Sequence, residues 1–156
     1  MLAPTWETIA SDLVRLGVAY VLALPIGWNR EREDRSAGLR TFPIVAVAAC
    51  GFTMLGTALP GATPESYSRM LQGMITGIGF IGGGAILRDK GGVTGMATAA
   101  SVWNIGIVGA AVGLGLFHIA VVLAAINLIT LKVLTPLKHQ LDARDSTNGN
   151  LTADKR

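Results

Sequence analysis

Charged residues are scarce in this sequence. Only 15% of its 156 residues are Asp, Glu, Lys or Arg, whereas soluble domains contain about 25%. The apolar residues make up 51% of the chain and stand in long uninterrupted runs, while the charges gather in short clusters. A soluble domain needs a polar outer surface, so this distribution indicates a protein whose outside is lipid.

Cysteine and histidine are also nearly absent. The one cysteine, Cys50, lies within an apolar run, so the sequence offers no disulfide framework and no cysteine metal site. His118 has no second histidine or acid at metal-ligand spacing on a predicted span. No pair of nucleophile and base is visible. We therefore expect no cofactor and no enzyme activity, and nothing in the sequence indicates nucleic-acid binding.

Five stretches are apolar and long enough to cross about 30 Å of hydrocarbon, which takes about 20 helical residues. The run 91–131 has no formal charge and is too long for one span, and Gly113-Leu114-Gly115 is its natural break. The sequence thus predicts an all-α polytopic membrane protein with one transmembrane domain over residues 1–137. Its helices are expected at residues 6–28, 42–59, 70–87, 94–113 and 118–137.

Two further predictions concern the first apolar run and the C-terminal residues. The first apolar run lacks a basic start and a cleavage site, so it is expected to be a retained helix rather than a signal peptide. Residues 138–156 are polar and cannot bury a core of their own. We expect them to form a mobile cytoplasmic tail.

Lysine and arginine determine the expected orientation. They cluster in residues 29–40, in the loop after the third predicted helix, and from Lys132 onward, and an odd number of spans places all of these on one side. The opposite side has only Arg69. Because cytoplasmic loops are enriched in Lys and Arg, we expect the N-terminus outside and the C-terminus in the cytoplasm. The arginines of residues 29–40 would also attract anionic lipid headgroups, or contact a partner protein or a nucleotide phosphate.

Glycine is abundant in the third predicted helix, although each glycine costs about 1 kcal/mol in a helix interior. Two explanations stay open. Small residues let a neighbouring helix approach closely, or the helix unwinds at residues 82–84 and turns backbone groups toward a polar cavity. A match to the dinucleotide fingerprint is coincidental because no βαβ unit surrounds it. The glycines are Gly73, Gly77, Gly79, Gly82, Gly83 and Gly84.

Asp12 and Arg15 stand three residues apart on the first predicted helix and so share a face. Arg15 lies roughly 10–13 Å below the outer end of that helix, where a cation costs at least about 2.5 kcal/mol unless it is paired or reaches water. The two residues form either a structural ion pair or part of a pore or partner-binding face. Hydrogen bonds between helices are an adequate explanation for other polar residues at membrane depth. These are Gln72, Thr76, Asn104 and Asn127.

Three ordered blocks between residues 24 and 109 are distinctive. The first is Gly27-x-x-Arg30-Glu31-Arg32 with Ala37-Gly38-Leu39-Arg40-Thr41. The second is Thr76-Gly77-Ile78-Gly79-Phe80-Ile81-Gly82-Gly83-Gly84, running into Ile86-Leu87. The third is Gly92-Val93-Thr94-Gly95, followed by Thr98-Ala99-Ala100-Ser101-Val102-Trp103. In these blocks the chain resembles the MgtC/SapB family of membrane proteins.

The resemblance implies a bacterial inner-membrane protein connected with magnesium limitation. Through longer members it implies stress adaptation and virulence, as intracellular survival during infection, and restraint of the F-type ATP synthase. Those members carry a soluble cytoplasmic domain after the last helix, whereas only the short tail follows Leu137 in this sequence.

Two functions remain under consideration. The first is a non-enzymatic regulator, a homo-oligomer in the bilayer, that contacts another membrane protein such as the ATP synthase or a transporter. The alternative is a small homo-oligomeric Mg²⁺ transporter or channel. Mg²⁺ demands oxygen ligands in near-octahedral geometry, and Arg15 beside the Asp12 carboxylate would repel it. The sequence therefore favours the regulator.

Overall fold

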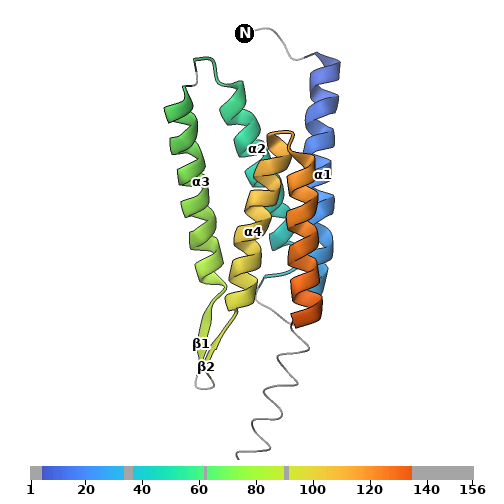
Figure 1. The fold of residues 1–156 in the computed structure, drawn as a ribbon, viewed down its shortest axis with the longest axis vertical. Coiled ribbons are helices and arrows are strands. Elements are labelled where there is room, and N and C mark those ends of the chain that lie inside the picture. Colours follow the sequence, from blue (N-terminus) through green and yellow to red (C-terminus); the bar gives the residue numbers. More distant parts are fainter. Residues whose placement is uncertain (1–4, 34–36, 62, 90–91, 135–156) are drawn as a thin grey trace, which may run out of the picture.

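The structure, a computed structural model, describes residues 5–33, 37–61, 63–89 and 92–134. These residues form five helices and one short β-hairpin (Figure 1). The helices lie along the long axis of the molecule, and successive helices point in opposite directions. The helices are α1 (Trp6–Arg32), α2 (Thr41–Ala58), α3 (Pro64–Gly84), α4 (Met96–Gly113) and a fifth helix, Phe117–Leu134. The strands β1 (Leu87–Asp89) and β2 (Gly92–Thr94) pair antiparallel, with Arg88 opposite Val93.

Four of these helices, α1, α2, α4 and Phe117–Leu134, are long and apolar enough to cross a membrane. The remaining helix, α3, has the length, but its glycines and polar residues lower its hydropathy. The predicted all-α polytopic architecture is confirmed. The C-terminal end of α1, the start of α2, the hairpin and the end of the fifth helix lie at one end of the bundle (Figure 1). We call this the cation-rich end, because it carries Arg32, Arg40 and Lys132.

The third helix differs from its predicted range of residues 70–87. It begins at Pro64, because Thr63 caps it: the Thr63 hydroxyl accepts the Ser66 amide at 3.2 Å, and the Ser66 hydroxyl accepts the Thr63 amide at 2.9 Å. Such a capping box satisfies amides that have no partner within the helix. The helix ends at Gly84. The suggested unwinding at residues 82–84 is therefore wrong, since these glycines form its last turn.

The other helix limits differ by smaller amounts. The first helix continues past residue 28 to Arg32, and the Glu33 amide still donates to the Arg30 carbonyl at 3.2 Å. The fourth helix starts at Met96 rather than at 94, because Thr94 is paired in the hairpin and Gly95 takes the left-handed conformation, with φ 88°. Residues 135–137 of the fifth predicted helix and the predicted tail, 138–156, lie outside the described residues.

Helices α2 and α4 approach each other closely at Gly109 and Gly113 of α4, of which the sequence marks only Gly113, as a break between two spans. A Cβ on Gly109 would collide with the carbonyl oxygen of Ala46 in α2, and one on Gly113 would lie 2.5 Å from that of Cys50. Next to these contacts the Thr53 hydroxyl of α2 donates to the Ala110 carbonyl of α4 at 3.3 Å. As a result, α2 and α4 pack together more extensively than any other pair among α1, α2, α3 and α4.

Helix α3 stands at the edge of the bundle and packs against α4 and α2 (Figure 1). Its buried residues Met74, Ile78 and Gly82 recur every four positions and so form one stripe along the helix. A Cβ on Gly82 would lie 3.1 Å from the carbonyl oxygen of Ala99 in α4. Only this stripe of α3 is covered, which leaves most of the helix surface exposed.

Candidate functional site

Arg15 is held by the end of α4 rather than by Asp12. Its Nη1 donates to the carbonyl oxygen of Gly113 at 3.0 Å, at the last residue of α4. No ion pair joins Arg15 to Asp12 in the described part of the chain, so the predicted structural pair is corrected. The last carbonyls of a helix lack partners within it and carry a partial negative charge. A guanidinium supplies both a donor and a matching charge there.

Replacing Arg15 by methionine is expected to lower the free energy of unfolding by about 2 kcal/mol, the value of a hydrogen bond to a charged group. The loss follows because the Gly113 carbonyl would keep no donor at a part-buried position. Denaturant unfolding in detergent micelles measures it. Asp12→Asn is the control, and we expect it to be much milder. An equal loss in both variants would show that an Asp12–Arg15 pair carries the effect instead.

The first sequence block forms the joint between α1 and α2. The Glu31 carboxylate accepts the Leu39 amide at 3.0 Å and lies against Gly38, where a Cβ would collide with it. On the preceding turn of α1, a Cβ on Gly27 would lie 3.2 Å from the Gly38 carbonyl oxygen. Both glycines stand at this close approach, and the block determines how α2 leaves α1.

Arg30 is the largest fully buried side chain of the described structure, with 2% of its surface exposed. Its Nη2 lies 2.9 Å from the Glu33 carboxylate and donates to the Asn29 side-chain oxygen at 2.9 Å. The charged run at residues 29–40 predicts a loop position for Arg30. In the structure it is instead a structural residue of the last turn of α1. Its neighbours Arg32 and Arg40 are exposed, and Thr41 begins α2.

The third sequence block joins the hairpin to α4. A Cβ on Gly95 would collide with the carbonyl oxygen of Ala85, just after α3, so only glycine fits the turn. Thr98 is buried, while Ala100 and Trp103 are exposed, and Ala99 offers the backbone that Gly82 approaches. This block thus packs the cation-rich ends of α3 and α4 together.

A polar cluster ties α4 to the fifth helix. The Ser101 hydroxyl donates to the side-chain oxygen of Asn127 at 3.0 Å, and the Asn127 amide donates to the side-chain oxygen of Asn104 at 3.2 Å. Hydrogen bonds between helices were expected for Asn104 and Asn127, and the structure shows one between them. Both polar groups of the Asn127 side chain are bonded within the cluster, which therefore orients the two helices.

The outer face of α3 brings together the remaining candidates of the sequence analysis. The Thr76 hydroxyl donates to the Gln72 carbonyl at 2.9 Å within the helix, and both residues are exposed. Phe80 is 85% exposed. A Cβ added at any glycine of α3 except Gly82 would meet nothing within 4 Å. These glycines are Gly73, Gly77, Gly79, Gly83 and Gly84.

Metal binding finds no support in the part of the chain that the structure describes. No group of three or more His, Cys, Asp or Glu side chains comes together there. Asp12 is partly exposed on α1, and His118 is exposed at the start of the fifth helix. These residues do not assemble an oxygen-rich cation site within one protomer.

Comparison with known proteins identifies the relatives of this chain. The sequence profile described as "MgtC family" matches residues 16–140. Protein MgtC of Brucella abortus is 36% identical over 98 residues, which cover 63% of this chain and 40% of the relative. Protein SapB of Bacillus subtilis is 32% identical over 106 residues, covering 64% of this chain and 46% of the relative. Protein SrpB of Synechococcus elongatus is 37% identical over 101 residues, covering 57% and 56%.

The chain thus spans about half the length, or less, of these relatives. No solved structure matches it. The profile match covers most of the sequence and includes all three sequence blocks, whose residues build the joints at the cation-rich end. This multi-pass membrane protein belongs to the MgtC family.

Proposed function

We propose that this chain is a non-enzymatic regulator of the bacterial inner membrane. It acts by laying the outer face of α3 against a helix of another membrane protein. Following the resemblance to the MgtC/SapB family, the setting is magnesium limitation and adaptation to stress, and the candidate partner is the F-type ATP synthase. The protein works as a homo-oligomer or as one component of that complex.

The observation that carries this proposal is the open space at the glycines of α3. Five of them have no neighbour within 4 Å of an added Cβ, so the packing of the protomer does not require glycine there. Each costs about 1 kcal/mol in a helix interior relative to alanine. In a membrane, small residues let two helix backbones approach closely. A partner helix therefore accounts for a glycine density that the protomer leaves unexplained.

The composition of α3 supports the same conclusion. It is the helix whose hydropathy is too low for a candidate span, and its outer face adds Gln72 and Thr76 to the glycines. Such a face interacts less favourably with lipid tails than the faces of α1 or of the fifth helix. Protein contact would bury its polar groups and supply packing partners.

Gly77→Leu and Gly83→Leu test the proposal. Both are expected to leave the protomer folded, because the added side chain meets open space. Recovery of ATP synthase membrane subunits with the tagged protein should fall by roughly tenfold, the effect of about 1.4 kcal/mol. Co-purification from mild detergent followed by quantitative mass spectrometry measures this loss.

Gly17→Leu provides the matched control, because Gly17 is also open, with no neighbour within 4 Å, but lies on α1. It should leave recovery unchanged. Full recovery in both α3 variants would contradict the proposal. So would Mg²⁺ flux into liposomes that contain only this protein, if Asp12→Asn abolishes it, since that result would establish the transporter instead.

A further inference from the structure

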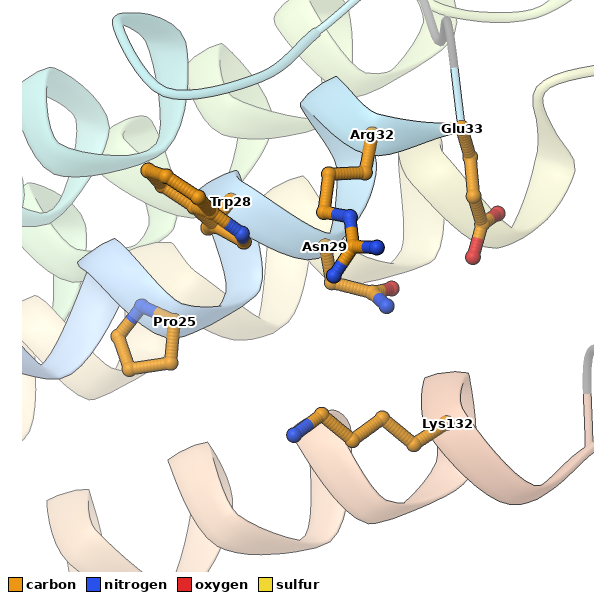
Figure 2. A pocket seen from close by; sticks show the side chains of 6 residues that line it. All are labelled: Pro25, Trp28, Asn29, Arg32, Glu33 and Lys132. Atoms are coloured by element: carbon orange, nitrogen blue, oxygen red, sulfur yellow. The ribbon is translucent and has the colours of Figure 1, made fainter.

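A groove lined by both charged and apolar side chains opens between the last turns of α1 and the fifth helix, at the cation-rich end. Its volume is about 470 Å³, within the usual range of about 300–1,000 Å³ for ligand pockets. Figure 2 shows Arg32 and Asn29 directed from α1 toward the fifth helix, where Lys132 lies across the gap. The groove is lined by Pro25, Trp28, Asn29, Arg32, Glu33 and Lys132.

The charge of this groove is positive. The Glu33 carboxylate lies 2.9 Å from Nη2 of Arg30, a buried cation that does not line the groove, so its charge is already matched. Among the described residues, neither Arg32 nor Lys132 makes an ion pair. Two cations from different helices thus face one space, with the Asn29 amide and the Trp28 indole as further donors. This is the chemistry that recognises a phosphate group.

Exposed apolar side chains precede the groove on both helices, on the side toward the middle of the membrane. Val21, one turn before Pro25 on α1, is exposed, and so is Ile129, one turn before Lys132 on the fifth helix. Trp28 is 58% exposed, and tryptophan favours the boundary between headgroups and hydrocarbon. A phosphate in the groove would therefore have apolar surface beside it, along which acyl chains could lie.

We propose that this groove binds the headgroup of an anionic phospholipid of the cytoplasmic leaflet. Arg32 and Lys132 contact the lipid phosphate, Asn29 donates to its oxygens, and Val21 and Ile129 contact the acyl chains. A free phosphate would use the cations but not the apolar surface, so the combination favours the lipid. The site lies on α1 and the fifth helix and is independent of the proposed contact through α3.

Quenching of Trp28 fluorescence tests the site directly. A variant with Trp6→Phe and Trp103→Phe keeps Trp28 as the one tryptophan. It is reconstituted in phosphatidylcholine vesicles that contain either brominated phosphatidylglycerol or brominated phosphatidylcholine. We expect phosphatidylglycerol to be preferred beside Trp28 by at least roughly fivefold. Arg32→Gln or Lys132→Gln should each reduce this preference by roughly fivefold, the effect of one basic residue at an anionic surface.

Arg40→Gln is the matched control. It removes one positive charge from the same end of the bundle, where Arg40 is exposed, but it leaves the groove intact. An equal reduction by Arg40→Gln would show that surface charge alone attracts the lipid, and would overturn the proposal. Relief of quenching by inorganic phosphate at constant ionic strength would also overturn it, since the occupant would then be a soluble anion.

Discussion

Replacement of Gly109 by leucine is expected to lower the free energy of unfolding by roughly 3 kcal/mol or more, at the upper end of overpacking effects. A side chain at this position would collide with the Ala46 carbonyl oxygen of α2. Backbone cannot turn aside as a flexible side chain can, so α2 and α4 would have to separate. They pack together more extensively than any other pair among the first four helices. Denaturant unfolding in mixed micelles measures the loss.

Gly77→Leu is the control for this effect, since it makes the same chemical change in the interior of another helix. A Cβ on Gly77 meets nothing within 4 Å, and leucine is the better helix former by roughly 0.8 kcal/mol. We therefore expect Gly77→Leu to be neutral or slightly stabilising. Similar losses in the two variants would show that the close packing of α2 on α4 does not carry the stability.

Replacement of Arg30 by methionine is the second substitution with a large expected effect. Arg30 is 2% exposed, and its partner Glu33 is 24% exposed. Removing this buried cation breaks its contacts with Glu33 and Asn29, and breaking a buried charged contact typically costs about 3 kcal/mol or more. The last turn of α1 and the joint to α2 should loosen together, because Glu31 and Gly38 adjoin this turn. Thermal unfolding in detergent measures the change.

Two companion variants separate the ion pair from the general loss of a cation. Arg32→Met removes the exposed neighbour on the same helix and should cost less than about 1 kcal/mol. The double variant Arg30→Met with Glu33→Gln removes both charges and should recover part of the stability lost in Arg30→Met. If the double variant is no more stable than Arg30→Met, the pairing with Glu33 is not the source of the effect.

Much of the fold could be predicted because lipid imposes a simple rule on sequence. Long runs without charge must become helices in a bilayer, and four of the five predicted ranges agree with helices of the structure to within a few residues. The errors fall where polar residues continue a helix beyond its apolar run. At Thr63 a cap starts α3 early, and at Arg30 the chain stays helical through a charged segment. Hydropathy does not predict the start of α3 or the end of α1.

Contacts of the candidate residues were harder to predict from the sequence than the helices. Spacing predicted an Asp12–Arg15 contact, because residues three apart share a helix face. The partner of Arg15 is instead the Gly113 carbonyl, 98 residues away in the chain, and no local pattern predicts that contact. The close packing at the glycines of α4 was missed for the same reason. Gly106, Gly109 and Gly113 recur at spacings of three and four, but their importance depends on which helix lies opposite.

The order of the amino acids is enough to predict an all-helical membrane protein, a gathering of cations at one end, and the resemblance to the MgtC/SapB family. These features follow from composition and local order, because a long run without charge must form a helix in a bilayer. Which helices contact one another is visible only in the folded structure. In that structure Arg30 is buried, and Arg15 donates a hydrogen bond to the end of α4. One face of α3 is uncovered, and Lys132 lies opposite Arg32. Such outcomes depend on contacts between distant segments, and those contacts are set by the fit of side chains across helices.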